Sequence, residues 1–157
     1  MDKLLKLLDT NARLSNAELA VMTGSTEDAV AKQIAAWEKD GVIRAYKALV
    51  DWDRTDREYV TAIIELRVTP KRDAGFEAIA QTIAAWEEVE SIYLMSGGYD
   101  FSIVVTGRTF KEVAMFVANR LSTLDSVVST ATHFVLRRYK EKNVMYAAEE
   151  KDEREGF

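Results

Sequence analysis

The spacing of apolar residues changes part-way along the chain, and this change constrains the fold more than any other feature. In the first part, apolar side chains recur at helical spacing, as Val30, Ile34 and Trp37 do at positions i, i+4 and i+7. From residue 60 to 68, every second residue is apolar, which is the spacing of a β-strand. A polar stretch separates the two patterns. The sequence therefore predicts a helical domain over residues 1–50, a linker over 51–58 and an α+β domain from residue 59.

The first fifty residues have the pattern of a winged helix-turn-helix. A leucine-rich segment predicts the first helix, and Ser15 with Glu18 forms the capping box that begins the second. Gly24 predicts the end of that helix, and Ser25 is predicted to cap a third. Residues 42–50 are predicted to form a strand. This order is typical of a DNA-binding domain, although a three-helix bundle that only dimerises has the same pattern.

The second half predicts a ferredoxin-like fold with the element order β-α-β-β-α-β. The predicted elements are a strand over 60–68, a helix containing Phe76 and Ile83, strands over 89–95 and 101–105, a helix over 110–121 and a strand from Val127 to about Arg138. This domain spans residues 59–138. A charged tail, 139–157, is predicted to begin with a short helix at 144–147.

The two middle strands predict an assembly, because apolar residues stand at consecutive positions in both of them. A sheet face in contact with water ordinarily alternates apolar and polar residues. Both faces of this sheet should therefore be covered, one by the two helices and the other by a second copy of the sheet. We expect a homodimer.

Composition excludes several kinds of site. The 157 residues contain no cysteine and one histidine, so disulfides, thiolate chemistry and multi-histidine metal sites are not expected, and neither is a cofactor. No apolar run approaches the ~20 residues of a membrane span, and the first residues lack the pattern of a signal peptide, so the expected location is cytoplasmic. The net charge of −5 comes mostly from the tail, since residues 1–50 carry seven basic and seven acidic side chains.

Five segments resemble the leucine-responsive regulator/AsnC (Lrp/AsnC) family of transcription regulators, and the resemblance covers about residues 2–140. The segments are Asp2–Leu8, Asn11–Ala20, Glu38–Ile43, Ser96–Asp100 and Val127–Leu136. The resemblance implies DNA binding by the first domain and sensing of a small effector, in this family an amino acid, by the second, RAM/AsnC-type domain. It also implies dimers built by sheet packing, often assembled into octamers, with the effector bound between dimers near the turn after the second strand, which in this chain is Gly97 to Asp100.

The third predicted helix would enter the DNA groove, and it departs from the family pattern because its outer face carries no arginine. Its first turn holds Glu27 and Asp28, which would face phosphates. The candidate base contacts are Lys32 and Gln33. The candidate phosphate contacts, which are equally consistent with a solvated surface, are Thr26, Lys39, Arg13, Arg44 and Lys47. Binding to double-stranded DNA should be weak per dimer, sensitive to salt and dependent on assembly.

The sequence Ser-Gly-Gly-Tyr-Asp at residues 96–100 predicts a tight hairpin turn between two strands. Its glycine backbone can hold an effector carboxylate, and its acid can pair with an ammonium group. The candidate effector residues are Ser96, Gly97, Gly98, Tyr99 and Asp100 in the turn and Thr130, Thr132 and His133 in the last strand. An ordinary hairpin, in which Asp100 bonds nearby backbone, explains the turn equally well. His133 is also consistent with a structural residue or a pH sensor.

Three functions are consistent with these patterns. The first is a transcription regulator modulated by an effector, without catalysis. The second is a ligand-sensing and assembly module whose helix-turn-helix has lost specific DNA recognition. The third is enzymatic, because some proteins similar to this family, the siroheme decarboxylases, act on tetrapyrroles. One histidine and no cysteine offer little acid–base or nucleophilic machinery, so we expect the chain not to be an enzyme.

Overall fold

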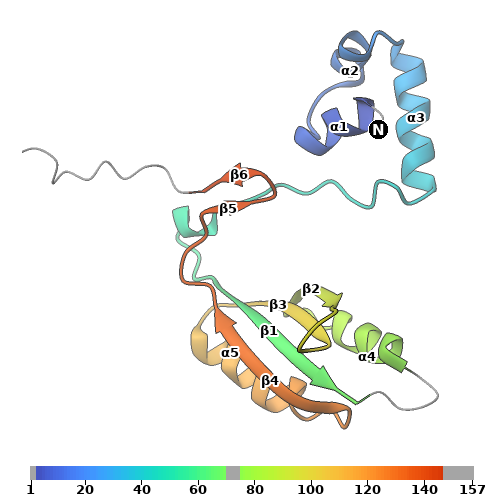
Figure 1. Cartoon of the computed structure of the whole chain (residues 1–157). Helices are drawn as coiled ribbons and strands as arrows, with labels where there is room; N and C mark the ends of the chain where they lie inside the picture. The colour runs from blue at the N-terminus through green and yellow to red at the C-terminus, as the bar shows by residue number, and fades with distance from the viewer. Residues whose placement is uncertain (1–2, 70–74, 147–157) are drawn as a thin grey trace, which may run out of the picture. The chain divides into compact units, whose positions relative to one another are not determined.

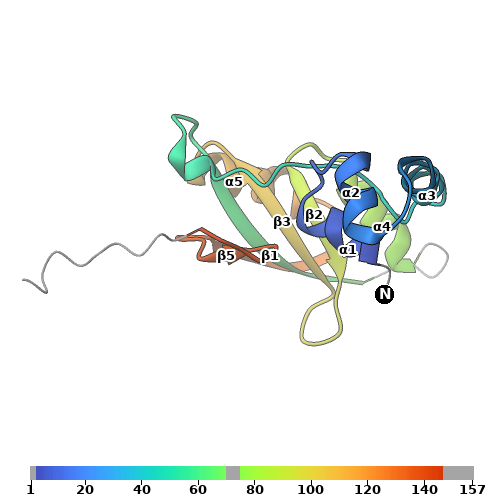
Figure 2. The same cartoon turned by 90° about the horizontal axis from the view of Figure 1, so that it is seen from above.

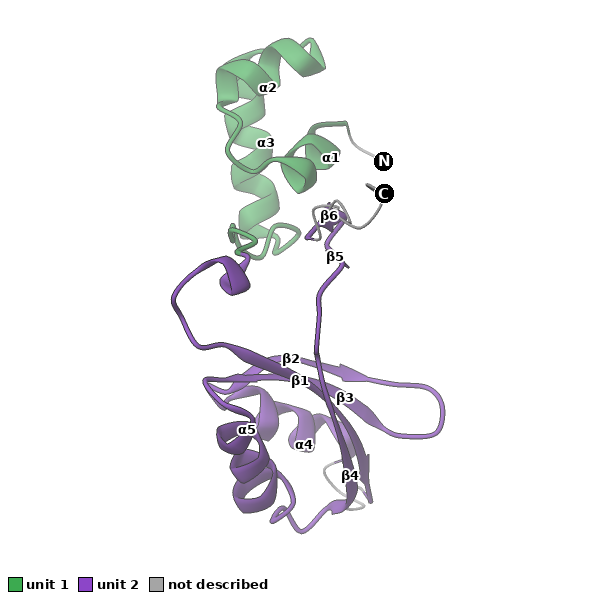
Figure 3. Ribbon diagram, turned by 90° about the vertical axis from the view of Figure 1, so that its left-hand side faces the viewer, with its two compact units in different colours: residues 1–50 green, residues 51–157 purple. Residues whose placement is uncertain are grey.

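The computed structural model describes residues 3–69 and 75–146, and its contacts divide the chain into two compact units, residues 1–50 and 51–157 (Figure 3). The first unit contains the helices α1 (Lys3–Thr10), α2 (Asn16–Thr23) and α3 (Glu27–Lys39). The predicted capping box is present at the start of α2. The backbone N–H of Ser15, and then its hydroxyl, lower the pKa of Glu18. The stabilisation from this box is therefore present above the ordinary pKa of the carboxyl and is lost as the pH falls through the lowered one.

A small leucine-rich core holds the three helices of the first unit together. Its buried members are Leu4 and Leu8 of α1, Leu19 and Ala20 of α2 and Val30 of α3. Ile34 and Trp37, the other apolar residues of the predicted α3 face, pack against this core and are partly buried. The remaining face of α3 is therefore free of the core.

Two predictions for the first unit are wrong. The N-cap of α3 is Thr26 and not Ser25: the Thr26 hydroxyl accepts a hydrogen bond from the N–H of Ala29 at 3.2 Å. Both are hydroxyl residues that cap well, so composition does not distinguish them. Residues 42–50 form no strand, because no other segment in the described ranges pairs with them. Instead, the Tyr46 hydroxyl donates to Oε1 of Glu38 at 2.8 Å, a bond that raises the pKa of Tyr46.

The second unit has the predicted β-α-β-β-α-β order. After a 3-10 turn, η1 (Trp52–Arg54), its elements are β1 (Val60–Val68), α4 (Gly75–Ala84), β2 (Val89–Leu94), β3 (Phe101–Gly107), α5 (Phe110–Phe116) with its π-helical end η2 (Val117–Leu121), and β4 (Val127–Phe134). The strands form one antiparallel sheet in the order β2-β3-β1-β4. Helices α4 and α5 lie on the same face of it (Figures 1 and 2).

The main core lies between the sheet and these two helices. Ile64 and Leu66 of β1 and Phe101 and Ile103 of β3 are almost fully buried there, together with Ile83 of α4 and Val113 of α5. The inward residues of β1 are those that the alternation predicts. The core therefore confirms the assignment of the buried face of this strand.

The end of the chain differs from the prediction. Strand β4 ends at Phe134, short of Arg138. A β-hairpin of β5 (Lys140–Glu141) and β6 (Val144–Met145) follows, where a short helix was predicted; Ala147 lies outside the described residues. The two residues between these strands, Lys142 and Asn143, have φ of 48° and 65°. Positive φ at both turn residues is the geometry of a two-residue hairpin, and a helix cannot contain it.

The sheet face opposite the helices is left open by the described residues of the second unit and is apolar at its centre. Ile63 of β1 is paired directly with Val104 of β3, and both side chains belong to this face. Tyr93 of β2 shares the face and is exposed, as is Ile63. Charged and polar residues, including Glu65 and His133, surround this centre. A solvated face would be polar, so this pattern still favours a covering partner.

Candidate DNA-binding and effector-binding sites

The outer face of α3 presents Lys32 and Gln33 to solvent, as the sequence predicts for base contacts. Nζ of Lys32 lies 2.7 Å from Oδ2 of Asp28, one helical turn earlier, and both side chains are about three-quarters exposed. Such exposed pairs contribute little to stability. The ion pair bears on the candidate DNA contact, because the Asp28 carboxylate partly neutralises the Lys32 ammonium on this face.

The candidate phosphate contacts are exposed but dispersed over the first unit. Arg13 precedes α2, Lys39 is the last residue of α3, and Arg44 and Lys47 follow it. The Arg44 guanidinium lies 3.4 Å from the point that a Cβ on Gly41 would occupy, so it folds back on the end of α3. The Thr26 oxygen already accepts the capping bond.

The turn between β2 and β3 is anchored at its base and extends beyond the sheet (Figure 2). The N–H of Met95 donates to the carbonyl of Asp100 at 2.8 Å, and the N–H of Asp100 donates to the carbonyl of Leu66 at 2.9 Å. Gly97 has φ of 139°, a backbone conformation suited to glycine, whereas Gly98 lies outside the positive region. Of the two glycines, only Gly97 therefore adopts a backbone conformation that favours glycine.

Asp100 has a structural partner outside its own turn. Its Oδ2 accepts a hydrogen bond from the N–H of Val68 at 2.8 Å. At this end of β1, the register with β4 shifts between Arg67 and Val68, so the ladder is irregular there. The carboxylate supplies an acceptor for a part-buried N–H at the irregularity, and this accounts for an acid at position 100 without a ligand.

Replacing Asp100 separates its structural role from a ligand role. Asp100→Ala leaves the N–H of Val68 without this acceptor and should lower the free energy of unfolding by about 1–3 kcal/mol. Asp100→Asn keeps an acceptor oxygen and should cost less. Urea unfolding of both variants measures the difference. Equal losses in the two variants would show that the carboxylate charge, and not the hydrogen bond, stabilises this corner.

The predicted effector residues of β4 lie on opposite faces of the sheet. Thr130 and Thr132 pair with Leu66 and Ile64 and belong to the helix-covered side. His133 lies on the open face, where its Nε2 is 3.5 Å from Oε1 of Glu65. Within one chain, the structure therefore does not bring His133 together with the two threonines.

A cavity in the second unit was missed by the sequence interpretation. It measures about 270 Å³ and is lined by residues of η1, β1, α5 and the segment that follows β4. None of the predicted effector residues lines it. The pair Arg137-Arg138 after an apolar strand is a local signal for it, but no spacing pattern joins this pair to a linker residue such as Asp53.

Comparison with known proteins assigns both units to one kind of regulator. The family model described as the Lrp/AsnC ligand binding domain matches residues 61–145, and a winged helix-turn-helix DNA-binding model matches residues 3–44. The chain belongs to the Lrp/AsnC family. It is thus a transcriptional regulator of the Lrp/AsnC type, with a helix-turn-helix domain followed by a ligand-binding domain.

Curated members of the Lrp/AsnC family match along almost their whole length. An HTH-type transcriptional regulator of Bacillus subtilis, YugG, is 45% identical over 153 residues, which cover 97% of this chain and 92% of the relative. The proline dehydrogenase transcriptional activator of Rhodobacter capsulatus is 29% identical, over 90% of this chain and 91% of the relative. These relatives are named as regulators of transcription.

Solved structures of Lrp/AsnC-type regulators share the fold. A transcriptional regulator of Neisseria meningitidis, solved as a complex with L-Met, is 25% identical with a TM-score of 0.74, over 90% of this chain and 93% of that one. AsnC of E. coli is 23% identical with a TM-score of 0.69, over 94% and 97%. Within the described ranges, no helix combines the length and hydropathy needed to cross a membrane.

Proposed function

We propose that this regulator binds double-stranded DNA through α3 and that an amino acid bound to its second unit changes this binding. The observation that carries the proposal is the match of residues 61–145 to a ligand-binding domain, in a chain similar to a regulator solved with L-Met. The exposed face of α3, with Lys32 and Gln33, supports the DNA contact. The chain then works as a sensor, without catalysis.

The open sheet face supports a homodimer as the unit that binds DNA. Its apolar centre, Ile63 with Val104, would be covered by the same face of a second copy. A dimer presents two α3 helices, and further assembly, as in an octamer, presents more. Because each α3 carries few cations, this multiplicity supplies affinity that a single helix lacks.

Fluorescence anisotropy with a duplex from the region upstream of the protein's own gene tests the DNA half of the proposal. We expect this duplex to bind more tightly than a scrambled one. The affinity should fall steeply between about 50 and 200 mM salt, because phosphate contacts release counterions. Equal affinity for both duplexes at every salt concentration would contradict sequence-specific regulation.

The ion pair on α3 favours a second candidate, a ligand-sensing module with weakened DNA recognition. The carboxylate of Asp28 lies against Lys32 and would oppose an approaching phosphate. Asp28→Asn should therefore raise DNA affinity by about 3–10-fold, since it removes a repulsion of the order of 1 kcal/mol. Asp9→Asn on α1, outside α3, is the charge-matched control. If Asp28→Asn leaves the affinity of an already weak complex unchanged, the second candidate is favoured.

A further inference from the structure

Two groups of contacts bound the segment that follows the helix-turn-helix. The first group lies at the end of α3. The N–H groups of Val42 and Ile43 both donate to the carbonyl of Trp37, at 2.8 and 3.1 Å. Gly41 has φ of 71°, the left-handed conformation in which a helix commonly ends. The direction in which the chain leaves α3 is therefore fixed as far as Ile43.

Two side chains extend this fixed exit to Tyr46. The Arg44 guanidinium lies against Gly41, 3.4 Å from the position that a Cβ would occupy there. The Tyr46 hydroxyl donates to Oε1 of Glu38 at 2.8 Å. Because Glu38 belongs to the last turn of α3, this bond holds residue 46 against a regular helix.

The second group of contacts begins at η1, in the second unit. The N–H and the hydroxyl of Thr55 both donate to the carbonyl of Trp52, at 3.0 and 2.8 Å. The Thr55 hydroxyl also accepts a hydrogen bond from the N–H of Arg57 at 3.2 Å. The turn is therefore closed twice at Trp52, and its order continues as far as Arg57.

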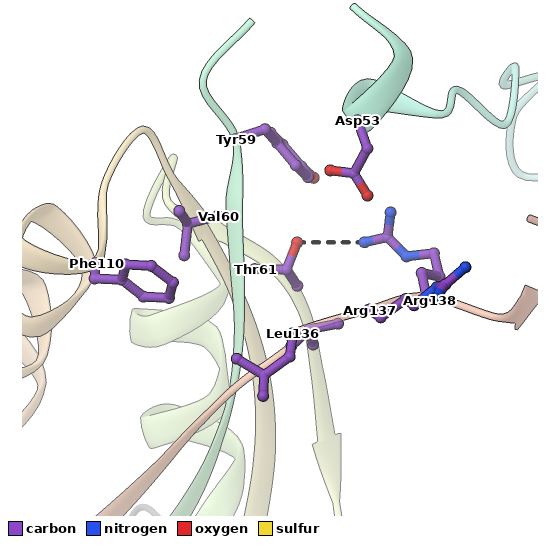
Figure 4. Close-up of a pocket in the computed structure, with 9 residues that line it drawn as sticks. Asp53, Tyr59, Val60, Thr61, Phe110, Leu136, Arg137 and Arg138 are labelled. Carbon is purple, nitrogen blue, oxygen red and sulfur yellow. Dashed lines mark hydrogen bonds between the residues drawn. The ribbon is translucent and has the colours of Figure 1, made fainter. Parts of the chain in front are cut away.

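The side chain of Arg57 is stacked on two aromatic rings. Its guanidinium carbon lies 4.5 Å from the centre of the Trp52 ring and 5.6 Å from that of Tyr59, within cation–π range. Figure 4 shows Tyr59 directed toward η1, which carries Asp53. The Tyr59 hydroxyl donates to Oε2 of Glu90 in β2 at 3.4 Å. The stack therefore holds the polar segment on the sheet domain.

Residues 47–50 lie between the two groups of contacts and are all exposed. They belong to no helix or strand, and no residue in the described ranges forms a backbone hydrogen bond with them. A segment with exposed backbone and few contacts reorients at low free-energy cost. Hinges in proteins are short segments of this kind, in which a few residues absorb the change in backbone angles.

We infer that Tyr46 and Arg57 are positioning residues for DNA binding. They confine the pivot between the two units to residues 47–50, and so they set the separation of operator half-sites that a dimer accepts. Without the Tyr46 bond the free segment begins at residue 45, and without the Arg57 stack it extends toward residue 59. A longer free segment reaches more separations and discriminates less between them. The inference rests on the proposed binding of DNA by a dimer.

Limited proteolysis of the full-length chain with trypsin tests the pivot without DNA. Lys47 lies in the free segment and Arg54 in η1, and mass spectrometry gives the cleavage rate after each, relative to a synthetic peptide of residues 42–60. We expect cleavage after Lys47 to be faster by at least about tenfold, because proteolysis follows the open population. Arg57→Gln should raise cleavage after Arg54 about fivefold, whereas Glu58→Gln, beside the stack, should leave it within about twofold. Equal relative rates after Lys47 and Arg54 in the wild type would overturn the inference.

The separation of half-sites tests the positioning role. Fluorescence anisotropy gives Kd for the upstream duplex and for the same duplex with about 5 bp, half a helical turn, inserted at its centre. We expect the wild type to prefer the original duplex by at least about tenfold, and Tyr46→Phe and Arg57→Gln to lower this ratio to about threefold or less.

Two variants control for charge and for side-chain shape. Glu38→Gln keeps an acceptor for the Tyr46 hydroxyl and should keep the wild-type ratio. Arg54→Gln removes the same charge as Arg57→Gln from outside the stack, so it should lower the affinity for both duplexes and leave their ratio unchanged.

The results separate the positioning role from the proposed function. A wild type that binds no duplex more tightly than a scrambled one overturns sequence-specific DNA binding, and the positioning role with it. A wild type that prefers its upstream duplex to the scrambled one, but accepts the insertion within about threefold, overturns only the positioning role. The same holds if Tyr46→Phe and Arg57→Gln discriminate between the two separations as the wild type does.

Discussion

Val104→Glu is expected to convert the protein to monomers and to abolish measurable binding to DNA at micromolar concentration. Val104 lies beside Ile63 at the apolar centre of the open sheet face. A two-fold interface would contain the new carboxylate twice, away from water and in an apolar surrounding. Leaving one buried charge unpaired costs about 3–5 kcal/mol, and ~3 kcal/mol already weakens a complex by roughly a hundredfold.

The oligomeric state of Val104→Glu is measured by size-exclusion chromatography with light scattering. Met115→Glu is the matched control, because it places the same charge on the exposed side of α5, in the layer opposite the open face. We expect the control to elute as the wild type does. A Val104→Glu protein that keeps the wild-type mass would show that the second copy does not cover this face.

Phe101→Ala should lower the free energy of unfolding of the second unit by about 3–5 kcal/mol. Phe101 is 1% exposed, and its ring meets that of Phe76 in α4 edge-to-face, with centroids 5.9 Å apart. The substitution removes an aromatic ring from the layer between the sheet and α4 and leaves a cavity. Domains of this size have about 5–15 kcal/mol of stability, so the variant should be close to unfolding at 37 °C.

Chemical denaturation followed by circular dichroism measures this loss, with Phe110→Ala as the control. Phe110 is 54% exposed and keeps only its contact with Phe134 as a specific ring partner in the described chain, so its removal should cost about 1 kcal/mol. Similar losses for both phenylalanines would mean that the core is not centred between the sheet and α4.

Much of the fold is predictable from the sequence because its signals are local. The capping box at Ser15, the left-handed Gly24 and the alternation along β1 each depend on neighbouring residues, and each prediction is confirmed. The segment 42–50 has strand-forming residues but finds no partner in the described part of the chain. Strand formation needs that partner, which a local pattern does not contain.

The sites are less predictable because they depend on register and on distant pairing. Successive side chains of a strand point to opposite faces, so His133 lies on the face opposite Thr130 and Thr132. A single effector site that contains all three residues is inconsistent with this alternation. The role of Asp100 toward Val68 requires the pairing of β1 with β3, and the approach of Asp53 to Arg138 joins positions 85 residues apart. No spacing rule in the sequence reports such contacts.

The central claim, that an amino acid changes DNA binding by this chain, is tested most directly by one titration. The affinity for the upstream duplex is measured by fluorescence anisotropy at fixed, moderate salt, with and without each standard amino acid at millimolar concentration. We predict that at least one amino acid, with an apolar side chain, shifts the midpoint by about 5-fold or more, as coupling free energies of 1–3 kcal/mol imply. Midpoints that stay within twofold for all of them, in a protein that binds the duplex, would contradict the account.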